Sequence, residues 1–257
     1  MQTWIALLLL SLATGAAFGG VEDVKTPRGE SVRLLVEKGS DSWVTVVLFA
    51  GGHGVLGITE DGALRDLGGN FLVRSRSRFV YFGAVAAVID APSDNSNSLH
   101  GFRDSPEHAE DVGAVIRHLK AKYRLPVWLV GTSRGTNSVA NAAVRLGADS
   151  ADGIVLTASM LSAPRRGTQV LAMNLEKVRL PVLIAHHRED ACDVTPPGGV
   201  EALRRRLTQA APVKVLWFEG GSGIRGNPCQ ARHYHGFAGI EQEVVAAIMR
   251  WIKSPAP

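Results

Sequence analysis

The sequence predicts an α/β protein, a doubly wound and mostly parallel β-sheet covered by helices on both faces. From residue 32 onward, short runs rich in β-branched residues alternate with longer amphipathic stretches. Several of the short runs are apolar at every position, which is typical of strands with a helical layer on each side. Strand–helix alternation along the chain favours parallel strands joined by helical crossovers.

Seven runs have the length and composition of strands. They cover residues 32–36, 43–49, 84–89, 127–130, 153–156, 182–185 and 213–218. We expect these seven runs to form the sheet.

Four stretches between these runs have the pattern of helices. The first begins at Ser105-Pro106, and the other three cover residues 134–146, 199–208 and 239–252. Ser105 is a good N-cap residue and Pro106 suits a first helical turn. Residues 65–82 must cross between two strands, but their pattern does not distinguish helix from loop.

Composition and charge exclude several classes of protein. The chain has 257 residues, of which 46% are hydrophobic, and 28 Lys and Arg against 24 Asp and Glu give a net charge of +4. We find no stripe of basic residues interleaved with aromatic ones, so nucleic acid is not an expected partner. With no Pro- or Ser-rich linker and no internal repeat, residues 21–257 are expected to form one domain.

The first twenty residues have the pattern of a signal peptide. An aliphatic run from Ile5 to Leu12 is followed by small residues, and residues 1–20 contain no charged side chain. We expect cleavage near Ala17 or Gly19, export to the periplasm or medium, and no stable membrane insertion afterwards. The alternative is an uncleaved membrane anchor.

Gly131-Thr132-Ser133-Arg134-Gly135 fits the pattern G-x-S-x-G. It directly follows the strand at 127–130 and opens a predicted helix, which is the strand–turn–helix setting of a nucleophile elbow. Glycines on either side of the serine allow a tight turn, and the helix N-terminus directs N–H groups at the serine oxygen. Ser133 is therefore the predicted nucleophile.

A serine hydroxyl needs a base, and the base needs an orienting acid. In this setting the acid and base follow the nucleophile along the chain. Asp190, just past the strand at 182–185, is the predicted acid. Asp193 is the alternative acid, and the side chain of Glu189 is expected to point away from that of Asp190. His235, beside Gly236 and before the last helix, is the predicted base, and His233 is its main competitor.

The second oxyanion donor is expected from the glycine-rich loop 50–54 that follows the strand at 43–49. One donor is the backbone N–H of Arg134, directly after the nucleophile. The other is the N–H of Gly52 or of His53, and the sequence does not decide between them.

A metal site is the rival interpretation of the segment that carries the predicted acid. His186, His187, Asp190 and Asp193 lie close together in the sequence. Adjacent histidines at the end of a strand point to opposite faces, so the two cannot readily bind one ion. We therefore predict no metal and no other cofactor.

The chain has two cysteines, Cys192 and Cys229. Cys192 follows the predicted acid by two residues, and Cys229 precedes the predicted base by six. Because the pairing of Asp190 with His235 brings their loops together, the cysteines are expected to be close. An exported protein is then expected to join them in a disulfide.

With these residues in place, the sequence resembles the α/β-hydrolase superfamily, and within it the small single-domain serine hydrolases with a dienelactone-hydrolase-like core. The resemblance runs from about Trp43 to Ile252 and rests on GTSRG at 131–135, HHRED at 186–190 and HGF at 235–237. It implies a sheet of eight strands, one more than the seven identified above.

The sequence departs from that family in two places. Dienelactone hydrolases use a cysteine nucleophile, whereas Ser133 stands here, and His53 follows the loop glycines instead of preceding them. Many relatives also carry a helical lid, for which residues 158–180 are too few.

The predicted function is hydrolysis of a carboxylic ester, or a related acyl bond, in a small molecule through a Ser133–His235–Asp190 triad and an acyl-enzyme. The alternatives are a peptidase or thioesterase on the same scaffold, or a non-catalytic binding module. Substrate choice depends on loops such as 91–102 and 160–167, whose shapes the sequence does not give.

Overall fold

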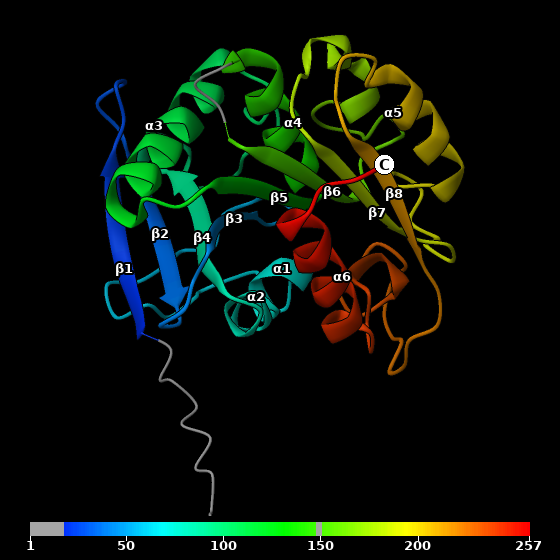
Figure 1. Ribbon diagram of the computed structural model, residues 1–257, viewed down its shortest axis with the longest axis horizontal. Coiled ribbons are helices and arrows are strands. Elements are labelled where there is room, and N and C mark those ends of the chain that lie inside the picture. The colour runs from blue at the N-terminus through cyan, green and yellow to red at the C-terminus, as the bar shows by residue number, and fades with distance from the viewer. Residues whose placement is uncertain (1–17, 148–150) are drawn as a thin grey trace, which may run out of the picture.

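Eight strands form one twisted sheet in the computed structural model, which describes residues 18–147 and 151–257 (Figure 1). The strands are β1 (Phe18–Lys25), β2 (Ser31–Lys38), β3 (Val44–Phe49), β4 (Ala84–Pro92), β5 (Val127–Ser133), β6 (Gly153–Ser159), β7 (Val182–His187) and β8 (Val213–Phe218). Their spatial order is β1-β2-β4-β3-β5-β6-β7-β8. β2 runs antiparallel to both β1 and β4. The six strands β3 to β8 are mutually parallel.

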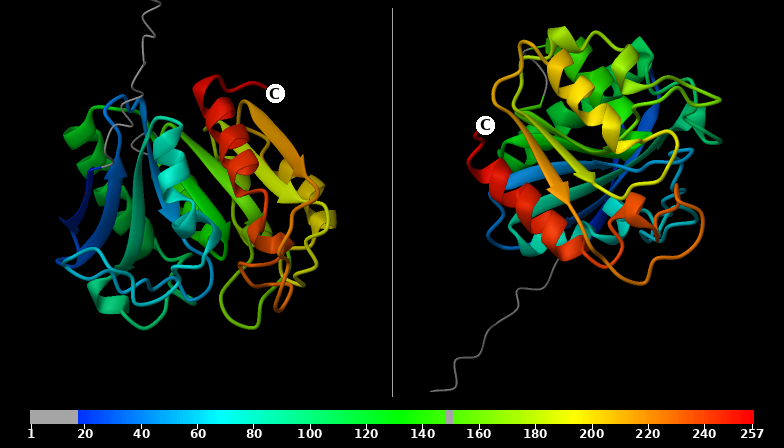
Figure 2. Two further views of the ribbon diagram at one scale, coloured as in Figure 1. Left: turned by 90° about the horizontal axis from the view of Figure 1, so that it is seen from below. Right: turned by 90° about the vertical axis from the view of Figure 1, so that its right-hand side faces the viewer.

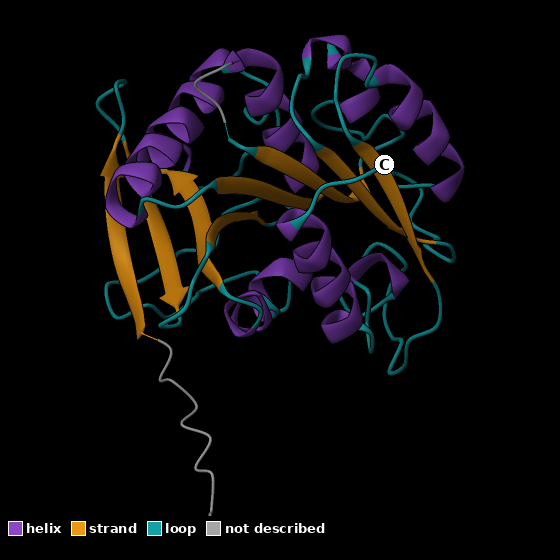
Figure 3. Ribbon diagram, in the orientation of Figure 1, coloured by secondary structure: helices purple, strands orange, loops and turns teal. Residues whose placement is uncertain are grey.

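Among the described residues, six α-helices cover the two faces of the sheet (Figure 3). They are α1 (Phe71–Arg74), α2 (Arg76–Tyr81), α3 (Pro106–Tyr123), α4 (Gly135–Arg145), α5 (Val200–Arg206) and α6 (Glu241–Lys253). α3, α4 and α5 lie on one face, and α1, α2 and α6 lie on the other (Figures 1 and 2). Each layer buries its apolar side chains against the sheet, so there are two cores.

The central strands are apolar on both sides because both sides are covered. All six residues of β3 and all seven of β6 are buried. The seven predicted strands and the four predicted helices are confirmed, with α4 beginning at Gly135 instead of residue 134. The undecided segment 65–82 contains the two short helices α1 and α2.

The strand that sequence analysis did not identify is β1. It pairs along its whole length with β2, from Phe18 opposite Lys38 to Lys25 opposite Ser31. The predicted signal peptide lies mostly outside the described residues, but its expected boundary at residue 20 falls inside this strand. Cleavage after Ala17 would leave β1 intact.

The connection from β6 to β7 carries no lid. Residues 160–181 contain only two single-turn 3₁₀ helices, Val170–Ala172 and Leu175–Lys177. Across the residues described, none of the helices combines the length and apolar character needed to cross a bilayer.

Candidate active site

Ser133 is the last residue of β5, two residues before α4 begins. Its φ angle is 53°, in the left-handed region that side chains other than glycine rarely adopt. Such strain persists only where the surroundings impose it, and it is concentrated at functional sites. The turn directs Ser133 out of the sheet at the carboxyl end of its central strands.

Close packing explains the glycines of the GTSRG motif. A Cβ on Gly131 would lie 2.6 Å from the carbonyl oxygen of Gly135, and a Cβ on Gly135 would overlap the carbonyl oxygen of Phe49. Larger residues at either position would push α4 away from β3 and β5. The two glycines are thus required because β3, β5 and α4 pack closely together at this turn.

Asp190 and His235 meet from two separate loops. Asp190 follows β7, and His235 lies in a single 3₁₀ turn, Tyr234–Gly236, between β8 and α6. His235 Nδ1 lies 3.1 Å from Asp190 Oδ2, and the two residues are only 5% and 3% exposed. A proton on Nδ1 donated to the carboxylate leaves Nε2 free as an acceptor.

Thr195 is a third member of this pair that sequence analysis missed. Its hydroxyl donates to Asp190 Oδ2 at 2.9 Å and lies 3.1 Å from His235 Nδ1. The hydroxyl has one hydrogen, so with that hydrogen on Asp190 its oxygen can only accept, and the single Nδ1–H is then shared between Thr195 and the carboxylate. The threonine belongs to no motif, and only the fold places it beside the pair.

The environment of Asp190 keeps its carboxylate ionised. Burial acts to raise its pKa, but the hydrogen bond from His235, the charge of that ring and the N–H of Cys192 outweigh burial, so the pKa is lowered. The Cys192 N–H donates to Oδ1 at 3.0 Å. An anionic Asp190 can both orient His235 and stabilise its protonated form.

A cavity of about 220 Å³ opens beside Ser133. Ser133 and His235 both line it, together with Gly51, Gly52, Leu67, Asn70, Phe71, Thr132, Cys229, Gln230, Ala231 and Gly236. Within the described residues, Ser133 and His235 form no hydrogen bond with each other. Such catalytic contacts commonly tighten only when substrate binds.

The two candidates for the second oxyanion donor occupy different places. Gly52 lines the cavity, whereas His53 is turned outward, with its Nε2 3.0 Å from Asp66 Oδ2. The side chain of Arg134 donates to the carbonyl oxygen of Arg166. Of the two candidates, Gly52 is therefore the one that lies at the cavity with Ser133.

The competing acid and base lie apart from this arrangement. Asp193 and Glu189 are exposed. Hydrogen bonds to Asp190 come from His235 and not from His233, whose ring instead packs edge-on against Tyr234. The structure therefore pairs the residues that the sequence favoured.

His186 and His187 point to different neighbours. His186 Nε2 donates to the carbonyl oxygen of Thr195 at 3.0 Å, while His187 stacks on Tyr234 and donates to the carbonyl oxygen of Gly220. Their ring nitrogens do not converge on a common point.

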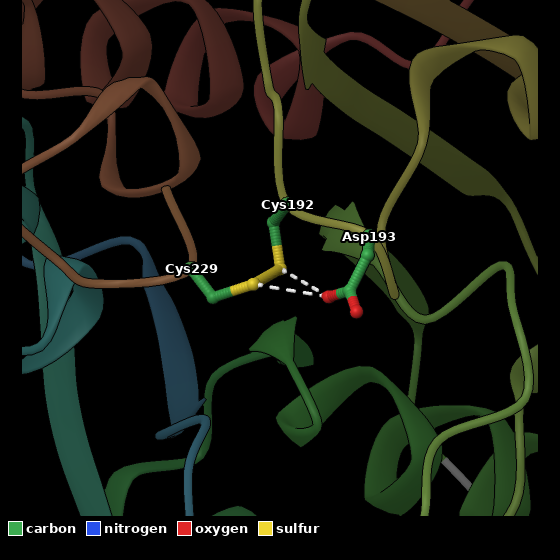
Figure 4. A group of neighbouring side chains, drawn as sticks. All are labelled: Cys192, Asp193 and Cys229. Atoms are coloured by element: carbon green, nitrogen blue, oxygen red, sulfur yellow. Dashed lines mark hydrogen bonds between the residues drawn. A yellow bond between two sulfur atoms is a disulfide. The ribbon is translucent and has the colours of Figure 1, made fainter. Parts of the chain in front are cut away.

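One cluster with metal-ligand atoms is found in the described part of the chain, formed by Cys192, Asp193 and Cys229. Figure 4 shows that its two sulfur atoms are bonded to each other. A disulfide offers no thiolate, so this cluster lacks the ligands of a zinc site.

The disulfide itself is the one that the sequence predicts. It joins Cys192 to Cys229 across 37 residues, with their Cα atoms 4.6 Å apart (Figure 4). Cys192 is buried beside Asp190, and Cys229 lines the cavity. The bridge thus ties the loop of the acid to the segment that leads into the base.

Solved structures match nearly the whole chain. An α/β serine hydrolase without a lid from Xanthomonas campestris is 19% identical, with a TM-score of 0.60, covering 93% of this chain and 96% of its own. A dienelactone hydrolase from Anabaena variabilis is 12% identical, with a TM-score of 0.65 and coverages of 92% and 97%. The chain has the α/β-hydrolase fold. An esterase from Pyrococcus furiosus shares this fold, at 12% identity and a TM-score of 0.66, covering 93% of this chain and 91% of its own.

Comparison by sequence gives no further assignment, because no protein-family model and no curated protein matches this chain. The lidless α/β-hydrolase fold expected from the sequence is confirmed by the structural matches. At these identities the likeness establishes the fold, and the chemistry must be argued from the site.

Proposed function

We propose that this protein is a serine hydrolase that cleaves carboxylic esters of small molecules through an acyl-enzyme. The observation that carries the proposal is the cavity that Ser133 and His235 share, with His235 held by a buried Asp190. A strained serine at a strand–helix turn, next to an oriented imidazole, is the arrangement of nucleophilic acyl transfer.

The reaction begins with neutral His235, whose Nε2 accepts the proton of the Ser133 hydroxyl as Oγ attacks the ester carbonyl. The carbonyl π electrons move to oxygen, and the backbone N–H groups of Arg134 and Gly52 stabilise the resulting oxyanion. Protonated His235 then gives its proton to the departing alcohol. Water, activated by the same ring, hydrolyses the acyl-Ser133 and releases the acid.

The size and lining of the cavity favour a short acyl or alcohol group. About 220 Å³ is small for a ligand site, and Leu67 and Phe71 give it apolar walls. The connection 160–181 brings no lid over it. We expect short-chain esters to be turned over faster than long-chain ones.

Hydrolysis of p-nitrophenyl esters of increasing chain length tests this proposal. Ser133→Ala is expected to lower kcat by roughly 10⁴-fold or more, because loss of a triad member removes the nucleophile. His235→Ala should be nearly as inactive, while His233→Ala, two residues away, should keep most activity. Esterase activity that survives Ser133→Ala would place the nucleophile elsewhere.

A peptidase or thioesterase on the same scaffold is the nearest alternative, because acyl transfer from amides and thioesters uses the same groups. The specificity constants for an ester, a thioester and an amide with the same acyl group would separate them. A non-catalytic binding module would hydrolyse none of the three.

We also propose that the protein acts outside the cytoplasm, as a periplasmic or secreted enzyme. The Cys192–Cys229 disulfide supports this, because such bonds persist mainly in oxidising compartments. Mass measurement of the mature N-terminus after expression in a bacterial host tests it. A chain that retains Met1 and stays in the cytoplasm would contradict it.

A further inference from the structure

Arg103 is a buried cation behind the glycine-rich loop. It lies between β4 and α3 and is 3% exposed. Across the described residues it forms no ion pair with a carboxylate, although other partly buried arginines, such as Arg28 and Arg74, do. An unpaired buried charge is costly and seldom found without a purpose.

The guanidinium group of Arg103 connects the two elements that flank Ser133. Its Nη2 donates to the carbonyl oxygen of Ala50 at 2.9 Å, and its Nη1 donates to Ser138 Oγ at 2.8 Å. Ala50 directly precedes Gly51 and Gly52 of the cavity wall. Ser138 lies in the first turn of α4, whose N-terminus carries the N–H of Arg134.

The loop is shaped around this guanidinium. Gly54 has a φ of 84°, and a Cβ there would overlap Arg103 Nη2. The N–H of Leu99 also donates to the carbonyl oxygen of His53 at 2.8 Å. The segment that carries Arg103 therefore holds the loop at two points, through a side chain and through the backbone.

The contact at Ala50 fixes the direction of the next peptide group. The bond from Ala50 to Gly51 is trans, so the carbonyl that faces Arg103 and the N–H of Gly51 point in opposite directions. Gly51 in turn packs on the nucleophile, since a Cβ there would lie 2.9 Å from Ser133 Cβ. A rotation of this peptide would displace Gly52 relative to Ser133.

We propose that Arg103 is a positioning residue for the oxyanion hole, holding the loop 50–54 in register with α4 and adding a buried positive charge behind the site. This inference rests on the proposed function. Arg103 touches no reacting atom and acts through the backbone of Ala50–Gly52 and the first turn of α4. Because the oxyanion exists only in the transition state, Arg103 should affect kcat more than KM.

The test compares Arg103→Met and Arg103→Lys with the intact enzyme. Reactive Ser133 is first counted by titration with a fluorophosphonate, so that kcat refers to folded protein. Removing one oxyanion donor outright costs about 10²–10³ in kcat, so loss of a group that only positions the donor should cost about 10–100-fold. KM should change less than about 3-fold.

Two further readouts separate positioning from simple stability. Affinity for a trifluoromethyl ketone, which forms a tetrahedral adduct on serine, should fall in parallel with kcat/KM in Arg103→Met. Arg103→Lys keeps the charge but not the two-pronged contact, so it should recover part of the lost kcat.

Arg206→Met is the matched control, because Arg206 donates to the carbonyl oxygens of Leu171 and Met173 away from the cavity. It should leave kcat unchanged.

A kcat in Arg103→Met within about 2-fold of the intact enzyme would overturn the inference, as would an equal loss in Arg206→Met. If Arg103→Met does not fold, Arg103→Lys tests the inference instead. We then expect Arg103→Lys to have a reduced kcat and an unaltered KM. An intact enzyme that neither reacts with the fluorophosphonate nor hydrolyses esters would refute the proposed function itself, whatever the Arg103 variants do.

Discussion

Thr195 links the proposed base, His235, to the carboxylate of Asp190 that orients it. Its hydroxyl donates to Asp190 Oδ2 and lies within hydrogen-bond distance of His235 Nδ1, and its side chain is fully buried. Thr195→Val keeps the shape and removes both contacts. A hydrogen bond to a charged group is worth about 1.5–3 kcal/mol. We expect kcat to fall by about 10-fold and the free energy of unfolding to decrease, as measured by ester hydrolysis and urea titration.

Thr45→Val is the matched control for this change. Thr45 is equally buried on β3, but its hydroxyl has no hydrogen-bond partner among the described residues. Its replacement should leave kcat unchanged and the protein no less stable. Thr195→Ser, which restores the hydroxyl, should restore most of the activity. If Thr195→Val retains full kcat, the hydroxyl does not position the pair.

The three proposed catalytic side chains could be predicted from the sequence, but their supports could not. Ser133 stands in a spaced motif, and Asp190 and His235 follow predicted strand ends in the expected chain order. Thr195 and Arg103 stand in no motif. Thr195 lies 40 residues from its partner His235 in the sequence, and Arg103 lies 53 residues from Ala50. Only the folded chain therefore identifies these contacts.

The loops that follow β7 and β8 are joined by the disulfide at the place where Asp190 meets His235. Closing 37 residues should stabilise the fold by up to about 4 kcal/mol on the chain-entropy model. The double variant Cys192→Ala/Cys229→Ala, or reductant on the intact protein, should lower the thermal midpoint. Because Cys229 lines the cavity and the N–H of Cys192 donates to Asp190, kcat should fall as well.

Thermal melts and ester hydrolysis, with and without reductant, check this expectation. The double variant is the control for other effects of the reductant, because reductant should change neither its thermal midpoint nor its kcat. Mass spectrometry of unreduced, alkylated protein should find no free thiol. Two alkylated cysteines in exported protein would contradict the bridge.

The strands differ in how well the sequence predicts them, and burial is the reason. β3 and β6 are buried throughout, so their residues are almost continuously apolar. β1 lies at the edge of the sheet, with the sequence FGGVEDVK, and pairs along its whole length with β2. Glycines and acidic residues give no strand pattern, so an edge strand of this composition escapes periodicity analysis.

The stability of the molecule as a whole should depend on pH through two buried histidines. Burial lowers the pKa of His108 to about 3, with the charges of Arg103 and Arg28 adding to the effect. Burial also lowers the pKa of His186 to about 4, although Asp190 opposes it. Both rings are therefore neutral in the folded protein at pH values where the unfolded chain would protonate them.

The sign follows from proton uptake. Between an unfolded pKa near 6.5 and the folded values near 3 and 4, the unfolded state binds more protons, so stability falls as pH decreases through this window. Each histidine contributes a slope of up to about 1.4 kcal/mol per pH unit. Urea titrations at pH 7 and pH 5 should show a lower free energy of unfolding at pH 5.

His108→Leu isolates one of the two contributions. Neither ring nitrogen of His108 has a hydrogen-bond partner among the described residues, so leucine removes a titrating group without removing a contact of that kind. The difference in unfolding free energy between pH 7 and pH 5 should shrink in this variant. An unchanged difference would show that His108 does not titrate on unfolding.

The central claim is that this fold presents Ser133 as an activated nucleophile, and covalent labelling tests it most directly. The folded, oxidised protein is treated with a fluorophosphonate probe, digested and examined by mass spectrometry. We expect a single adduct on the peptide that contains Ser133, slower labelling in His235→Ala and no adduct in Ser133→Ala. A folded protein that stays unlabelled, or that carries the adduct on another residue, would contradict the account.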